Sequence, residues 1–137
     1  MRNRDLASDY VARAAIRLEA LDVLFDHGGW ADVVREAQEA VELALKGLLR
    51  EHGVAAAREI HDVSEVLLAE RARLPAAVQS ELEALAAISR DLRRDRELAF
   101  YGAEDLTPSG FYTREDADRA RSGARRAVTA VRPHVPM

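Results

Sequence analysis

The sequence has 137 residues, a length that fits one domain, and 48 % of them are apolar, which is enough to build a core and argues against disorder. Its net charge of −4 gives no support for nonspecific nucleic-acid binding, although this overall charge does not exclude a local basic patch. The absence of cysteine excludes disulfides and thiolate chemistry. Because the strong helix formers Ala, Leu, Glu and Arg dominate, and alternating β-branched stretches are absent, we predict an all-α fold.

No segment of the sequence predicts a membrane contact. Apolar runs fall well short of the ~20 residues that span a bilayer. The first ten residues, MRNRDLASDY, lack the apolar region of a signal peptide. Together with the absence of cysteine, these features lead us to expect a cytoplasmic protein.

The first predicted helix spans 4–27, with Asn3 as its N-cap. Gly28 and Gly29 end it, because glycine adopts the left-handed conformation that closes a helix without a Cβ penalty. The second predicted helix, 30–52, begins at once and ends before Gly53. A connection this short predicts an antiparallel hairpin of the two helices.

The two faces of the second predicted helix differ sharply. Apolar residues recur at steps of three and four along one face: Trp30, Val34, Ala37, Val41, Ala44, Leu45 and Leu48. Charged residues follow the opposite face: Arg35, Glu39, Glu42 and Lys46. They form two i,i+4 pairs of opposite charge, each contributing roughly 0.2–0.5 kcal/mol. The charged face is interpreted either as solvated or as a polar groove or dimer contact lined by Glu39, Glu42 and Lys46.

Two further helices are predicted in the middle of the chain. Asp62 lies three residues before Glu65, a spacing that resembles a capping box and predicts a short third helix over 63–72. Pro75 suits the first turn of a fourth helix, which runs to 101. Together with a last helix near the end of the chain, these helices predict a compact up-down bundle.

The end of the chain contains a loop and that last helix. Residues 102–112 include two glycines and a proline and are predicted to be an ordered loop. Thr113 is the predicted N-cap of the last helix. Pro133 and Pro136 end the structure, and we expect a flexible tail over 133–137 of a single domain that comprises residues 1–137.

A basic run on the fourth predicted helix offers the first candidate chemistry: Arg90, Arg93, Arg94 and Arg96. Arg96 falls on the apolar side of that helix, where a guanidinium must snorkel, form an ion pair or face a ligand. The forked guanidinium is well matched to phosphate. Tyr101, near the end of the helix, is more often a core residue when it stands alone.

The histidines do not predict a metal site. His61 precedes Asp62, and we expect it to make a local turn contact. His27, His52 and His134 are helix-end or tail residues. No two histidines have an i,i+4 spacing, and phosphate-loop, dinucleotide-binding and nucleophile-elbow motifs are absent, so we predict neither a metal nor a cofactor.

Four stretches together resemble the HEPN family (higher eukaryotes and prokaryotes nucleotide-binding) over nearly the whole chain. The first stretch is 33–49, VVREAQEAVELALKGLL, which is similar to the signature of the family's second helix. The others are 60–63, IHDV, then Arg96 with FYG at 100–102, and 113–117, TREDA. The resemblance implies a bundle of four or five helices that is usually a homodimer.

The resemblance also implies a set of functions. Many relatives are small prokaryotic proteins encoded beside a minimal nucleotidyltransferase, and some of these pairs are toxin–antitoxin systems in which the HEPN partner is a metal-independent RNase. Such RNases carry an Arg followed four to six residues later by His, which transfers a proton while the Arg stabilises the phosphorane-like charge. Here none of Arg93, Arg94 and Arg96 is followed by His at that spacing. The missing His argues against enzymatic activity.

The favoured hypothesis is a homodimer that binds a nucleotide or RNA, a minimal nucleotidyltransferase partner, or both. In this hypothesis Arg93, Arg96 and Tyr101 face a cleft between protomers, and Glu39 and Lys46 contribute secondarily. Two alternatives stay open. One is an RNase toxin in which His61 or Tyr101 replaces the usual His, with Arg96 retained. The other is a helical interaction module without catalysis.

Overall fold

The computed structural model describes the backbone of residues 3–101 and 107–137 and the side chains of residues 5–93 and 107–137. These residues are mostly helical and contain no strand, so the predicted all-α class is confirmed. The long helices are α1 (Asn3–Asp26), α2 (Trp30–Glu51), α5 (Leu82–Tyr101) and α7 (Arg114–Val131). The short helical segments are α3 (Ser64–Ala69), η1 (Arg71–Arg73), α4 (Ala76–Gln79), α6 (Pro108–Phe111) and η2 (Arg132–His134).

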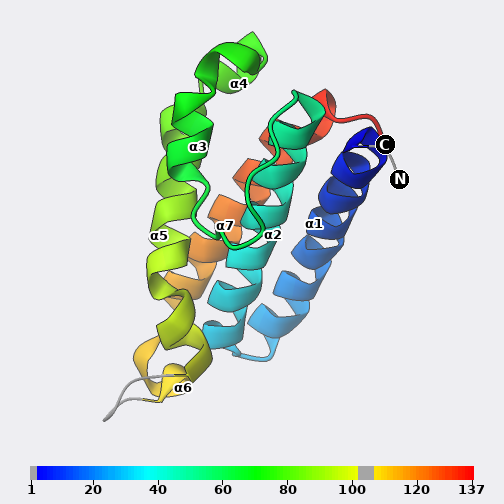
Figure 1. The fold of residues 1–137 in the computed structure, drawn as a ribbon. Helices are drawn as coiled ribbons and strands as arrows, with labels where there is room; N and C mark the ends of the chain where they lie inside the picture. The colour runs from blue at the N-terminus through cyan, green and yellow to red at the C-terminus, as the bar shows by residue number, and fades with distance from the viewer. Residues whose placement is uncertain (1–2, 102–106) are drawn as a thin grey trace.

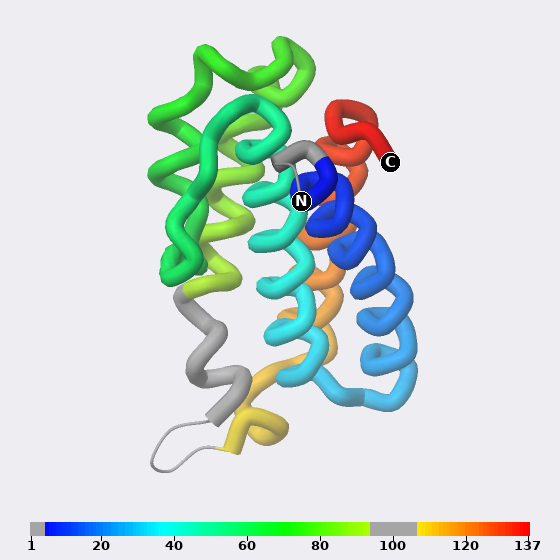
Figure 2. The backbone as a smooth tube through the Cα atoms, turned by 45° about the vertical axis from the view of Figure 1, so that its right-hand side comes forward, coloured from blue at the N-terminus to red at the C-terminus, as the bar shows by residue number. Residues whose placement is uncertain are grey.

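The long helices run alternately up and down, with α2 at the centre of the bundle (Figure 1). Helix α2 contacts α1, α5, α6 and α7, and the apolar stripe predicted for it is buried except for the partly buried Trp30. Both chain ends lie at the same end of the bundle (Figures 1 and 2). The predicted bundle is therefore confirmed, and α2 is the helix around which the other long helices pack.

The predicted hairpin of the first two helices forms as the glycines indicate. Gly28 has a positive φ of 73°, and the backbone N–H of Gly29 donates to the carbonyl of Leu24, which closes α1. The ring of Phe25 then packs edge-on against Trp30 at a centroid distance of 5.0 Å. Gly53, with φ 88°, closes α2 in the same way.

The third helix differs from the prediction at both ends. Helix α3 covers Ser64–Ala69, so it is shorter than the predicted 63–72, and the separate turn η1 follows it. The predicted capping box is wrong, because Asp62 accepts a hydrogen bond from the backbone N–H of Ser64 at 2.9 Å and Glu65 is exposed. The hydroxyl oxygen of Ser89 in α5 accepts a hydrogen bond from the backbone N–H of Val63 at 3.0 Å.

The fourth predicted helix is divided in two. Helix α4 ends at Gln79 and α5 begins at Leu82, so the single helix predicted over 75–101 is wrong. The hydroxyl of Ser80 donates to the carbonyl of Ala77 at 2.8 Å, and the N–H of Glu81 bonds the carbonyl of Val78 rather than that of Ala77. A serine side chain that competes for a helix carbonyl favours such a tight turn.

The last part of the chain is partly as predicted. Residues 102–106 of the predicted loop lie outside the described residues, and 108–111 form α6. Thr113 caps α7 as predicted, in a reciprocal capping box with Asp116. Val135 is buried in the core after η2, while the flexibility expected for 133–137 stays a prediction.

Candidate functional site

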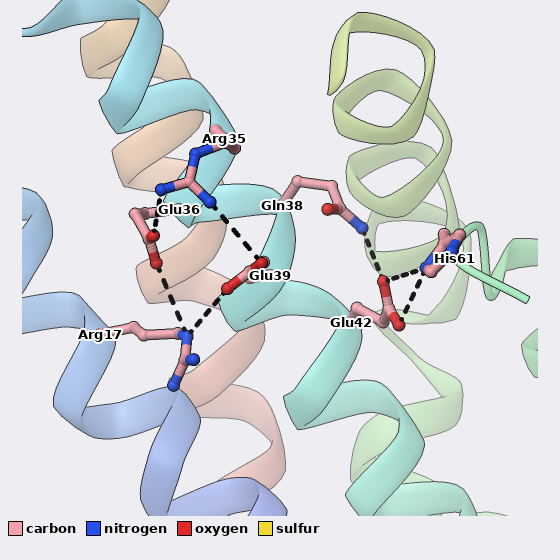
Figure 3. A network of polar contacts seen from close by, with 7 residues as sticks. All are labelled: Arg17, Arg35, Glu36, Gln38, Glu39, Glu42 and His61. Atoms are coloured by element: carbon pink, nitrogen blue, oxygen red, sulfur yellow. Dashed lines mark hydrogen bonds and ion pairs between the residues drawn. The ribbon is translucent and has the colours of Figure 1, made fainter. Parts of the chain in front are cut away.

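The polar side chains of α2 gather into two groups, one against α1 and one against the segment that precedes α3 (Figure 3). We call the first the Arg17 cluster, which consists of Arg17, Arg35, Glu36 and Glu39. We call the second the Glu42 cluster, which consists of Gln38, Glu42, Lys46 and His61. Both arise because α2 is covered on several sides, so that even its charged face is only partly open to solvent.

The Arg17 cluster joins α1 to α2. The guanidinium of Arg17 lies 3.6 Å from Glu36 and 3.4 Å from Glu39. Arg35 lies 2.8 Å from Glu36 and 3.7 Å from Glu39, which confirms the predicted Arg35–Glu39 pair. Two guanidiniums thus balance two carboxylates, an arrangement that supports the helix pair and leaves no net charge for a ligand.

The Glu42 cluster is more deeply placed. The carboxylate of Glu42 accepts hydrogen bonds from the side-chain amide of Gln38 at 2.8 Å and from the ammonium of Lys46 at 3.1 Å. The predicted Glu42–Lys46 pair is confirmed, but the interpretation of a solvated face is wrong for Lys46, of which only 9 % is exposed. Lys46 also lies 3.4 Å from the backbone carbonyl of Arg58, so the ammonium is held on two sides.

His61 completes this cluster from a distant part of the chain. Its Nδ1 lies 3.0 Å and 3.2 Å from the two carboxylate oxygens of Glu42, 19 residues earlier. The local turn contact predicted for His61 is therefore wrong. The segment after α2 turns back along the bundle before α3 begins (Figures 1 and 2). This return brings His61 beside Glu42, near the middle of α2 (Figure 3).

Asp62 anchors His61 in this position. Burial on its own raises the pKa of the Asp62 carboxyl, but hydrogen bonds from the backbone and side chain of Ser64 and from the Ser89 hydroxyl, together with the charge of Arg90, outweigh it and lower the pKa below its usual value. The Ser89 hydroxyl lies 3.2 Å from Asp62. The carboxylate form of Asp62 thus ties the start of α3 to α5.

This anchor predicts a pH dependence of stability. Since the pKa of Asp62 is lower in the folded protein, its contribution to the free energy of unfolding is complete above about pH 4 and is lost as the pH falls through the folded pKa. We expect Asp62→Asn to lower the free energy of unfolding by about 1 kcal/mol at neutral pH. Urea titrations of both proteins at several pH values check this, and a difference that grows on acidification contradicts it.

The predicted site residues are divided between the two clusters, helix α5 and the part of the chain whose side chains the structure does not describe. Glu39 belongs to the Arg17 cluster and Lys46 to the Glu42 cluster. Arg93 is half-buried on α5. The side chains of Arg96 and Tyr101 lie outside the described residues. Of the five predicted site residues, the structure therefore describes the side chains of three: Glu39, Lys46 and Arg93.

Sequence reasoning missed two features of this site. Gln38 is 2 % exposed, and its amide oxygen is buried without a hydrogen-bond partner among the protein atoms described. Its i,i+4 spacing to Glu42 was the available signal. The contact of His61 with Glu42 had no local signal, because it depends on how the segment after α2 returns.

Neither a metal cluster nor a membrane-spanning helix occurs among the described residues. Side chains 5–93 and 107–137 include no group of three or more His, Cys, Asp or Glu arranged to hold a metal ion. Among the helices, as far as the structure describes them, none is both long and apolar enough to cross a membrane.

Comparison with known proteins decides the family. The family model of the HEPN domain matches residues 7–134, nearly the whole chain. This chain belongs to the HEPN domain family. The crystal structure of TT1696 from Thermus thermophilus is similar to this HEPN domain with a TM-score of 0.77 and 28 % identity, over 97 % of this chain and 99 % of that one. A search of curated proteins found no match.

In the Glu42 cluster of this HEPN domain, the Glu42 carboxylate holds the imidazole of His61 through its Nδ1 atom. About 35 % of the His61 side chain is exposed, whereas the side chain of Glu42 is 17 % exposed. A carboxylate that binds Nδ1 fixes the orientation of the ring and leaves Nε2 to contact something else. The arrangement is therefore suited to hydrogen bonding or proton exchange with a bound group.

Proposed function

We propose that this HEPN domain protein is a homodimer that binds a nucleotide or RNA, a minimal nucleotidyltransferase partner, or both, in a two-component system of the toxin–antitoxin kind. In this proposal Arg93, Arg96 and Tyr101 face a cleft between protomers, and Glu39 and Lys46 contribute from α2. Family membership and the order of the sequence motifs support the proposal.

The observation that carries the proposal is the Glu42 cluster. The buried ammonium of Lys46 and the partly buried carboxylate of Glu42 lose much of their hydration, and such a pair contributes little to net stability compared with well-packed apolar residues. Lys46 and Glu42 nevertheless lie next to the partly exposed imidazole of His61. Their arrangement is better explained by recognition of a polar ligand or partner than by stability.

A dye-based or calorimetric melt with a panel of nucleotides and short RNAs tests the binding. Ligand binding raises stability by RT ln(1 + [L]/Kd), so a millimolar nucleotide with micromolar affinity adds about 4 kcal/mol. We expect the shift to be lost in Arg96→Ala and reduced in Arg93→Ala. Arg73→Ala, at an exposed ion pair with Glu70, is the control and should keep it.

The oligomeric state and the partner need separate measurements. Mass-resolved sizing should give a dimer, and co-expression with a neighbouring nucleotidyltransferase gene product should give a complex. A monomer contradicts the dimer, and wild-type protein that binds no nucleotide, RNA or nucleotidyltransferase overturns the proposal. If Arg96→Ala changes neither nucleotide binding nor partner affinity, the assignment of the site is wrong.

The Glu42–His61 pair favours one second function, an RNase with a variant catalytic set. A carboxylate-held imidazole can accept the proton of an RNA 2′-hydroxyl, the role of the His that is missing after Arg96. Growth arrest on expression that is relieved by either His61→Ala or Arg96→Ala would favour the RNase. Intact RNA after incubation with concentrated enzyme would exclude it.

A further inference from the structure

We propose that His61 binds a phosphate group through Nε2 and takes up a proton as the phosphate binds. This inference rests on the proposed nucleotide or RNA binding and names the chemical group that the polar face of α2 recognises. The phosphate can belong to a free nucleotide or to an RNA backbone, because both present the same anionic oxygens.

The geometry of the imidazole is the first support. Nδ1 of His61 is occupied by both oxygens of Glu42, so the ring is fixed on that side. The neighbouring Asp62 is bonded to Ser64 and Ser89, which holds the backbone at His61 in place. Nε2 belongs to the opposite part of a ring that is partly exposed. A donor on a fixed, partly exposed ring binds an anion with little loss of side-chain entropy.

The balance of charge around His61 is the second support. The charged groups that bond to or lie beside His61 and its neighbours are Glu42 and Lys46 of α2, Asp62 of the intervening segment and Arg90 of α5, and the same segment carries the exposed side chains of Arg58 and Glu59. Lys46 compensates Glu42, and Arg90 lies close enough to Asp62 to lower its pKa. With a neutral His61 these pairs are balanced, since the exposed side chains of Arg58 and Glu59 also carry opposite charges, and the backbone carbonyl of Arg58 adds only a dipole.

Protonation of His61 therefore adds one positive charge to a balanced site. A phosphate at Nε2 compensates that charge, so phosphate binding and proton uptake favour each other through linkage. The hydrogen bond from a protonated imidazole to a phosphate oxygen is charge-assisted and stronger than a neutral one. His61 thus couples the occupancy of the site to pH.

Calorimetry of the full-length protein tests the coupling directly. Inorganic phosphate, a nucleoside monophosphate, the unphosphorylated nucleoside and a short RNA are titrated at pH 7 in two buffers with different heats of ionisation. We expect proton uptake with the short RNA, whose phosphodiesters do not titrate near pH 7, together with RNA affinity that is higher at pH 6 than at pH 8 and no binding of the nucleoside through this site. Inorganic phosphate and the monophosphate titrate at about pH 6 to 7 themselves, so for these probes the uptake assigned to His61 is the part that is lost in His61→Gln. Relative affinities of mononucleotide and RNA identify the source of the phosphate.

His61→Gln is the decisive variant, because its amide can still donate to Glu42 but takes up no proton. We expect it to abolish the proton uptake seen with the short RNA and to weaken phosphate binding about tenfold. His52→Gln is the matched control, since His52 is a partly buried histidine whose Nδ1 lies 2.9 Å from the carbonyl of Leu48. It should leave proton uptake and affinity unchanged.

A second measurement keeps the test valid if His61→Gln does not fold. The ring protons of the four histidines are followed by NMR in the wild type, and His61 is assigned by elimination with variants of the other three. Phosphate should shift the His61 signals toward those of the protonated ring. Nucleotide binding without proton uptake or a His61 response overturns this inference but leaves the proposed function intact, whereas no binding of any probe or partner overturns both.

Discussion

Gly47→Ala is expected to lower the free energy of unfolding by about 2 kcal/mol, although alanine is the better helix former. A Cβ at this position would lie 2.7 Å from Cγ2 of Val11 and 3.0 Å from the backbone oxygen of Ala7. An exposed helix gains about 1 kcal/mol from Gly→Ala, but overpacking a close contact costs about 1–3 kcal/mol or more. The backbone oxygen belongs to α1 and cannot rotate away, so the two helices must separate.

Gly123→Ala is the matched control for this prediction. Gly123 is also in a long helix, α7, but a Cβ there would meet only the side chain of Ile88, at 3.3 Å. Because that side chain can shift, we expect a change of less than about 1 kcal/mol in either direction. Thermal and urea unfolding of both variants measure the difference. If Gly47→Ala melts at or above the wild-type temperature, the close approach of α1 and α2 is contradicted.

Glu42→Leu is expected to lower the free energy of unfolding by about 3 kcal/mol, because it removes the one carboxylate that Lys46 and His61 share. Loss of one partner leaves a buried charge uncompensated, which typically costs about 3–5 kcal/mol. The lower end applies here, since Lys46 keeps the carbonyl of Arg58. The double variant Glu42→Leu, Lys46→Leu should recover much of this loss, because the buried ammonium and its partly buried carboxylate partner are then both gone.

The control for Glu42 is Glu39→Leu in the Arg17 cluster. Glu39 is more exposed, and both of its arginine partners keep Glu36 as a second carboxylate, so we expect a loss of about 1 kcal/mol or less. Urea unfolding of the three variants decides between the cases. Equal losses for Glu39→Leu and Glu42→Leu would mean that burial of Lys46 does not control the energetics of this face.

Much of the fold was predictable because it depends on local patterns. The apolar stripe of α2, the glycines after α1 and α2, and the Thr113 cap all act within one or two helical turns. The division between α4 and α5 was not predicted, since it depends on a side-chain hydrogen bond of Ser80 that competes with the helix. Propensity alone does not distinguish such a turn from a continuous helix.

The candidate site also has one part that the sequence predicted and one part that it did not. The pairs Arg35–Glu39 and Glu42–Lys46 follow from a spacing of four residues on one helix, which the sequence contains. The burial of Lys46 does not follow from that spacing, because it requires the segment at Arg58 to cover the helix. A charged stripe has the same pattern whether solvent or protein lies against it.

By itself, the sequence determined the helical class, the order of the long helices, the family and the absence of His at the Arg-x4–6-His spacing, because each is written in local composition and motifs. Only the tertiary structure decided that Glu42 and His61 meet. Their contact spans 19 residues and depends on the return of the chain after α2. Such a contact is set by packing among helices, where the cost of burying a charge is offset only by partners brought from elsewhere in the fold.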